Sequence, residues 1–257
     1  MFTSGQQVPA ATIPMVREER RVVIGGRPEL WRLEWRTPPQ PVCGPDSEDW
    51  WTCPCSGFAF GETGKLDLVR LREGHEVERF PLAPLFDSGE PPTDTDNAVL
   101  RRWDVRKSDW KYTNLEQPGR PTPVPGVRTR AQATAMKLAD YDHDGHATEF
   151  FLQTETPPCG KHIGVVVGVS EKTPRLHGFG TALRPDKPLL MSESAWTALV
   201  QSQGSARVVV WACGDHASDH ETELELSATS GEIRVTNREF QCSEDDKREQ
   251  LISEEPL

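Results

Sequence analysis

The chain has 257 residues with a formal net charge of −11, and hydrophobic residues make up 35% of it. This length is enough for one large or two small domains with a proper core. The acidic balance argues against a nucleic-acid or anionic-membrane partner, because phosphate groups would be repelled over most of the surface. No apolar run approaches the length of a membrane span, and residues 1–20 lack the apolar core of a signal peptide.

Turn-forming residues are frequent along the whole chain. The 22 prolines and 20 glycines favour many short strands joined by turns over long helices. Residues 1–20 are expected to be a flexible N-terminus. Strands are predicted over 21–26 and 29–35, joined by a Gly-Gly-Arg-Pro turn, because the second segment alternates with period two. A further hairpin is expected over 66–72 and 76–80.

Six cysteines in a proline-rich chain favour an oxidising compartment, secreted or periplasmic. Cys53 and Cys55 are separated by a single proline and are poorly placed to pair with each other. At least one of them is therefore expected to bond Cys43. Cys213 and Cys242 each follow a predicted strand, and we expect a disulfide between them. Reduced cytosolic thiols, or a zinc site at the Cys-x-Cys pair, are the alternatives.

The middle of the chain combines loops with a basic, tryptophan-bearing segment. Residues 87–97 and 116–126 are rich in Pro, Asp, Gly and Thr and are expected to be exposed loops, the second a possible subdivision of the domain. Between them, residues 101–111 contain five Arg and Lys side chains, which could bind an anionic sugar or peptide. The interpretation we favour is an amphipathic element with Trp103 and Trp110 in the core.

The second half of the chain predicts a central strand, one helix and a terminal group of strands. Residues 163–169 are a nearly continuous β-branched run, as in strands buried on both faces. A helix is predicted over 192–203, with Ser192 or Ser194 as its cap and Gly204 at its end. Three further strands, in antiparallel style, are expected over 207–212, 221–227 and 232–235.

Together these elements predict a mainly β fold, an antiparallel sandwich or a partial propeller-like arrangement, with one notable helix. Residues 21–242 would form a single β-rich domain. The remaining residues, 243–257, are dense in Glu, Asp, Lys and Arg and are expected to be a solvated, frayed tail.

The strongest chemical signal is residues 140–149, which read Asp-Tyr-Asp-His-Asp-Gly-His-Ala-Thr-Glu. Asp140, Asp142 and Asp144 alternate, so a curling loop can turn all three carboxylates inward, and Gly145 permits the positive φ that closes the backbone around a cation. Carboxylates held this close repel one another unless a cation or protons neutralise them. We therefore predict a Ca²⁺ site, with a solvated acidic turn as the alternative.

The flanks of this loop do not match an EF-hand. With Asp140 as the first position, an EF-hand places a bidentate Glu at the twelfth, which is Phe151, whereas the nearest acid is Glu149 at the tenth. Residues 149–153 are also β-prone, where an EF-hand has a long helix.

The stretch from Met136 to Glu155 resembles the calcium loop of FG-GAP and VCBS repeats, in which an Asp-x-Asp-x-Asp-Gly loop runs directly into a strand. In those repeats the last acid stands at the ninth position, which is Thr148 in this chain. Either Glu149 or a water held by Thr148 is therefore expected to complete the shell.

Two histidines lie inside the loop. The backbone carbonyl of His146, at the seventh position, is the group that a calcium loop uses, which leaves its imidazole free. His143 stands at a non-ligand position and is expected to point outward. Two inward imidazoles would suit a transition metal, but the alternating carboxylates argue against that.

A weaker candidate for a second site lies in residues 213–221. Asp215, His216 and His220 could bind zinc or copper if the segment were helical. Gly214 and the strand that follows favour a polar hairpin loop instead.

The sequence leaves two classes of function open. It contains no nucleophile elbow, phosphate loop, dinucleotide fingerprint or His-Glu-x-x-His motif. We favour an extracytoplasmic calcium-binding module whose ligand is a protein or a carbohydrate. The alternative is a secreted hydrolase with a structural calcium ion, whose catalytic acids, among Asp67, Asp104 and Glu149, would converge only in the folded chain.

Overall fold

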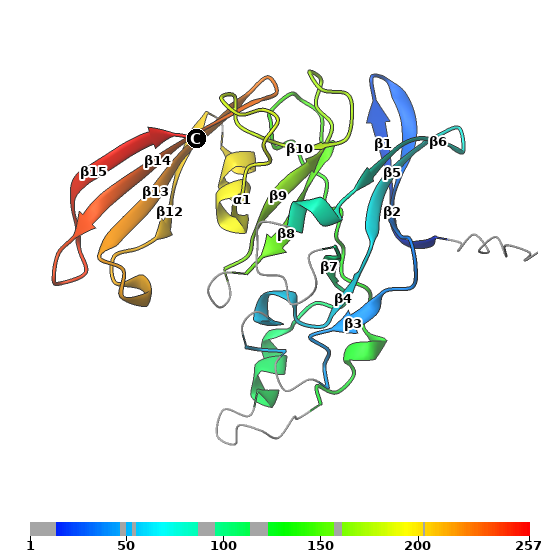
Figure 1. Ribbon diagram of the computed structural model, residues 1–257, viewed down its shortest axis with the longest axis horizontal. Coiled ribbons are helices and arrows are strands. Elements are labelled where there is room, and N and C mark those ends of the chain that lie inside the picture. Colours follow the sequence, from blue (N-terminus) through cyan, green and yellow to red (C-terminus); the bar gives the residue numbers. More distant parts are fainter. Residues whose placement is uncertain are drawn as a thin grey trace, which may run out of the picture.

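The chain folds into antiparallel sheets stacked in layers, with one α-helix between two of them (Figure 1). The computed structural model describes residues 14–46, 50–52, 55–86, 96–113, 123–156, 161–202 and 204–257. The predicted fold class, mainly β with antiparallel pairing and one notable helix, is confirmed. Among these residues no helix is both long and apolar enough to cross a membrane.

The first layer is a four-stranded sheet in the order β1-β2-β5-β6. Its strands are β1 (Met15–Ile24), β2 (Arg27–Trp35), β5 (Leu66–Arg72) and β6 (His75–Pro81). Gly25 and Gly26, at φ +54° and +76°, form the turn between the first two strands, a backbone that suits glycine. Both predicted hairpins are confirmed, but the flexible N-terminus over 1–20 is wrong for its last residues, which are paired in β1.

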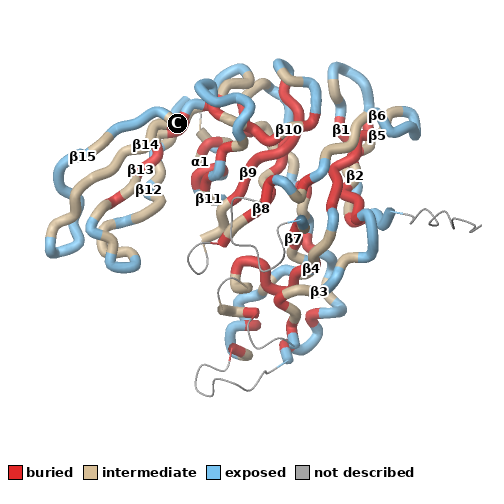
Figure 2. The backbone as a smooth tube through the Cα atoms, in the orientation of Figure 1, coloured by how far each residue is buried: buried red, intermediate tan, exposed pale blue. Residues whose placement is uncertain are grey.

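The central layer is built around β9 (Ile163–Gly168), which pairs with β8 (Glu149–Glu155), β10 (His177–Gly178) and β11 (Met191–Ser192). Val165 and Val167 pack toward the first layer, while Val166 belongs to the core on the opposite side. This burial on both faces explains the continuous β-branched run and confirms the predicted central strand. Figure 2 shows β9 as buried along most of its length.

The third layer consists of α1 (Glu193–Gln201) and a sheet in the order β12-β13-β14-β15. The strands are β12 (Ser205–Trp211), β13 (His220–Thr229), β14 (Glu232–Cys242) and β15 (Arg248–Pro256). Ser192 caps the helix, since its Oγ accepts a hydrogen bond from the Ala195 amide at 3.2 Å. Trp196 fastens the helix to the central sheet, because its buried Nε1 donates to the Gly164 carbonyl at 3.0 Å.

The predicted frayed tail is wrong, because residues 248–256 form β15 along the edge of the terminal sheet. Opposite charges meet across the strands: Arg238 bonds Glu254 at 2.8 Å, and Arg248 bonds Glu223 at 2.8 Å. A dense run of mixed charge therefore forms a strand here, since its charged partners lie on the paired strand β14 and on β13 beyond it.

A smaller sheet of β3 (Gln40–Val42), β4 (Gly61–Gly64) and β7 (Ala98–Arg101) lies below the first layer in Figure 1. Trp103 is half-buried and Trp110 is 51% exposed, so the prediction that both are core residues is wrong for Trp110. Asp109 takes the inward position instead, bonded to the Arg130 guanidinium at 2.7 Å. Short 3₁₀ helices occur at Cys55–Phe58, Ala83–Phe86, Lys107–Tyr112, Val127–Thr129 and Asp215–Ala217.

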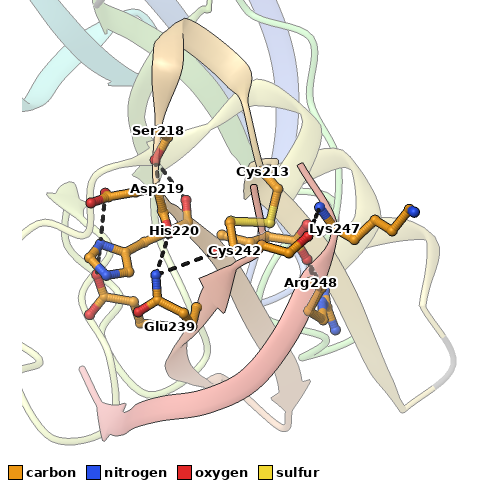
Figure 3. The surroundings of a disulfide bond; sticks show 11 residues. Cys213, Ser218, Asp219, His220, Glu239, Cys242, Lys247 and Arg248 are labelled. Atoms are coloured by element: carbon orange, nitrogen blue, oxygen red, sulfur yellow. Dashed lines mark hydrogen bonds and ion pairs between the residues drawn. A yellow bond between two sulfur atoms is a disulfide. The ribbon is translucent and has the colours of Figure 1, made fainter. Parts of the chain in front are cut away.

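Two predicted disulfides are present. Cys43 bonds Cys55 with a Cα–Cα distance of 5.3 Å, and Cys213 bonds Cys242 with a Cα–Cα distance of 5.6 Å. The second closes the end of the terminal sheet, beside the polar side chains of His220 and Glu239 (Figure 3). Cys53 lies outside the described residues.

Replacing Cys213 and Cys242 together by serine should lower the free energy of unfolding by about 3–4 kcal/mol, because the bond closes a loop with a sequence separation of 29 residues. Urea unfolding followed by tryptophan fluorescence measures this loss. Reduced wild-type protein serves as the control, and an unchanged urea midpoint for the double variant would contradict the structural role.

A buried charge network holds the first layer together. Glu29 accepts hydrogen bonds from Arg70 at 2.8 Å and Arg72 at 2.6 Å, and the Glu29 side chain is fully buried. Burial alone would raise the pKa of Glu29, but the bonds from these two arginines outweigh it and lower the pKa. The ionised carboxylate therefore stabilises the fold above its usual pKa of 4.5, and this contribution is lost as the pH falls below that value.

Glu29→Gln should destabilise the protein by about 3 kcal/mol at neutral pH, because it leaves the buried Arg70 with one carboxylate partner fewer. The difference from wild type should shrink as the pH is lowered below 4.5. Chemical denaturation at pH 7 and at several acidic pH values measures both effects. A difference that is independent of pH would show that the charge of Glu29 is not the stabilising feature.

Candidate metal centre

The acidic loop lies between an isolated bridge and the first strand of the central sheet. The Ala139 amide donates to the Glu149 carbonyl at 2.8 Å, and the Glu149 amide donates back at 3.3 Å, which closes the base of the loop. β8 begins directly at Glu149, and residues 131–138 form no helix. This arrangement confirms the expectation from sequence that the loop runs into a strand and is not flanked by the helices of an EF-hand.

Three carboxylates meet inside the loop. Asp140, Asp142 and Glu149 each offer an oxygen, and these oxygens lie within 4.8 Å of one another. Two oxygens bound to one Ca²⁺ ion at 2.3–2.6 Å stand at most about 5 Å apart. The spacing therefore suits a shared cation, and no other group of this kind occurs in the part of the chain that the structure describes.

The loop backbone orients two of these carboxylates. Asp140 accepts hydrogen bonds from the amides of Asp144, at 3.1 Å, and Gly145, at 3.0 Å, and Gly145 has φ +93°. Glu149 accepts from the Tyr141 amide at 2.8 Å. Each carboxylate oxygen has two lone pairs, so these bonds fix the orientation and leave acceptor capacity for an ion.

Asp142 is the most unusual group of the loop. Its side chain is fully buried, one oxygen accepts a 3.2 Å bond from the Asp144 amide, and Oδ2 has no hydrogen-bond partner. Burial, with Asp144 nearby, raises the pKa of Asp142 to about 7, and burial likewise raises the pKa of Glu149 to about 8. A buried carboxylate oxygen without a hydrogen-bond partner is energetically costly unless a proton or a cation binds it.

Asp144 and His146 were also predicted as ligands, and they face other partners. The Asp144 carboxylate accepts from the His146 amide at 2.8 Å and from the Glu171 amide at 2.6 Å, and it stands outside the close group of three. The His146 carbonyl accepts from the Thr148 amide at 3.1 Å. Thr148 donates its hydroxyl to Glu149.

The loop is fastened to the third layer by contacts that sequence analysis missed. His143 Nε2 donates to the Leu199 carbonyl of α1 at 3.0 Å. The turn between β13 and β14 approaches from the other side, where the Ser230 amide donates to the His143 carbonyl at 3.1 Å and the Gly231 amide donates to the Asp142 carbonyl at 3.0 Å. The Ser-Gly pair in the sequence predicts a turn, but it does not predict which distant residues that turn contacts.

The weaker candidates for a second metal site have separate partners. Asp215 bonds Lys161 Nζ at 2.6 Å and His216 Nδ1 at 2.7 Å. His220 Nδ1 lies 3.2 Å from Asp219 and 3.7 Å from Glu239 (Figure 3). His216 and His220 thus face different carboxylates, and Lys161 supplies the local positive charge.

The three acids considered for catalysis lie in different environments. Asp67 is buried and paired with Arg36 at 2.8 Å and Arg79 at 2.9 Å. Asp104 lines a cleft beside α1, and Glu149 belongs to the acidic loop.

Comparison of the chain with protein-family models, with curated proteins and with solved structures finds no match.

Proposed function

We propose that the protein is an extracytoplasmic, β-rich binding or structural module in which one Ca²⁺ ion is held by the loop of residues 140–149. The observation that carries this proposal is the unpartnered, fully buried Oδ2 of Asp142, within a close group of three carboxylates. A cation at this point would satisfy that oxygen and offset the repulsion among the three charges.

The donor set favours calcium over other cations. All three side chains offer only carboxylate oxygens, which are hard ligands, and no Cys or His belongs to the group. Ca²⁺ accepts six to eight oxygens in flexible geometry, whereas Mg²⁺ demands a near-ideal octahedron. The placement of Glu149 in the group, with Thr148 bonded to it, supports Glu149 over a Thr148-held water as the last ligand.

The contacts of the loop support a structural role for the ion. The backbone beside Asp142 bonds the β13–β14 turn, and His143 bonds α1, so an ordered loop holds the third layer against the central sheet. The disulfides support the extracytoplasmic assignment, since such bonds persist in oxidising compartments. The partner of the module would be a protein or a carbohydrate.

Calorimetry on chelator-treated protein should show one Ca²⁺ bound, and Asp142→Asn should weaken the affinity by at least about a hundredfold, because the unpaired buried oxygen loses its charge. Asp186→Asn, an equal charge change at an exposed position, is the matched control. Comparing the calcium affinity of Glu149→Gln with that of Thr148→Val identifies the last ligand. We expect Glu149→Gln to lose more affinity. Absence of binding at millimolar Ca²⁺ would refute the proposal.

Calcium should also raise the melting temperature. An ion that binds only the folded state stabilises it by about 2.7 kcal/mol at a hundredfold excess over the dissociation constant. Thermal melts at several Ca²⁺ concentrations, with Mg²⁺ and the Asp142→Asn variant as controls, measure this linkage. A fixed midpoint in a protein that calorimetry shows to bind calcium would mean that the loop is not coupled to the core.

A further inference from the structure

A cleft of about 270 Å³ opens between β7, β8 and the start of α1. It is separate from the carboxylate group of the loop. Its lining combines apolar residues, among them Phe58, Val99, Leu100 and Phe151, with polar and charged side chains. A pocket with an apolar lining and a few convergent polar groups is the usual form of a small-molecule site.

Arg101, at the end of β7, is the central polar group of this cleft. Its Nη2 donates to the Gly57 carbonyl at 2.7 Å, while its buried Nε has no hydrogen-bond partner. No carboxylate of the described residues lies within ion-pair distance of its guanidinium, although most of the described arginines have one. Burial lowers the pKa of Arg101, and the carboxylates of Asp104 and Glu193, which stand beyond ion-pair distance, only partly offset this effect.

His162 and Glu193 complete the polar part of the lining. The Glu193 carboxylate can only accept, so His162 Nδ1 donates to it, at 2.8 Å, and this bond fixes the ring. The other ring nitrogen, Nε2, carries no proton in the neutral ring and can accept from Arg101 Nη2, which lies 3.5 Å away, the long limit of a hydrogen bond. Lys137 also lines the cleft and is exposed. The charged donors available to an anion in this cleft are therefore the Arg101 guanidinium and the Lys137 ammonium.

The lining also limits the charge and shape of the ligand. Glu193 and Asp104 line the same cleft and would repel a dianion such as phosphate. A planar monocarboxylate matches the arginine fork and carries a single charge. The apolar part of the lining then suits an aromatic or branched aliphatic body attached to that carboxylate.

We propose that this cleft binds a small organic monocarboxylate with an apolar body, its carboxylate beside Arg101. The site shares none of its residues with the three carboxylates of the loop, although Tyr141 of the loop lines it. The same chemistry is offered by a free acid and by the carboxyl terminus of a peptide that ends in a large apolar residue.

Titration of the calcium-saturated protein with benzoate and 3-phenylpropionate, followed by calorimetry and by protein NMR shifts, tests the proposal. The neutral amide of each acid should bind at least about tenfold more weakly, because it offers no charge to Arg101. An acetylated Gly-Phe dipeptide with a free carboxylate is the peptide arm. Tighter binding of the dipeptide than of 3-phenylpropionate would assign the site to peptide termini, and the reverse would assign it to free acids.

Arg101→Met should weaken carboxylate binding by about tenfold to a hundredfold while leaving amide binding unchanged. Arg102→Met is the matched control, since the next residue lines a different cleft beside Trp103 and should bind as wild type does. Thr197→Trp, at an exposed position of α1 on the cleft, should block binding with Arg101 intact, which keeps the test valid if Arg101→Met fails to fold.

The proposal would be overturned by equal binding of acids and amides, by equal losses in the Arg101 and Arg102 variants, or by no binding of any carboxylate at millimolar concentration. Each measurement is repeated with Asp142→Asn, in which the calcium site is removed. Carboxylate binding that survives in this variant supports a separate site whatever the outcome for calcium.

Discussion

The buried carboxylate of Asp142 is the constraint on which the junction between the layers depends. Its side chain is fully buried with one oxygen unpaired, while its backbone carbonyl receives the Gly231 amide of the terminal sheet. The residue thus belongs both to the charged interior of the loop and to the contact that docks the third layer. Because a buried charge is costly when it stands alone, neutralising this carboxylate favours the buried position of Asp142 at this contact.

Sequence analysis predicted those features of the fold that depend on local pattern. The hairpin around Gly25, the strand over 163–168 and the cap at Ser192 each follow from periodicity or turn chemistry within a short segment. The errors concern partners distant in the chain. The tail forms β15 because Arg248 meets Glu223 across strands, and Trp110 is exposed because Asp109 pairs with Arg130.

The sites show the same difference between features set by local sequence pattern and features set by distant contacts. The alternation of Asp140, Asp142 and Asp144 predicted a shared cation, with Glu149 as one of two candidates for the last ligand, and the structure brings Asp140, Asp142 and Glu149 together. The sequence did not reveal the role of Asp144. Its carboxylate accepts a hydrogen bond from the amide of Glu171, which lies in a different loop. Arg101, His162 and Glu193 come from three elements far apart in the sequence, and only the fold shows that they line one cleft.

Tyr141 joins the two sites physically. It stands between Asp140 and Asp142 in the chain, its amide donates to Glu149 at 2.8 Å, and its side chain lines the cleft. The ring also meets Trp196 of α1 edge-on, with centroids 5.9 Å apart. One wall of the cleft is therefore positioned by the same hydrogen bonds that arrange the carboxylates, so the shape of the cleft depends on the order of the loop.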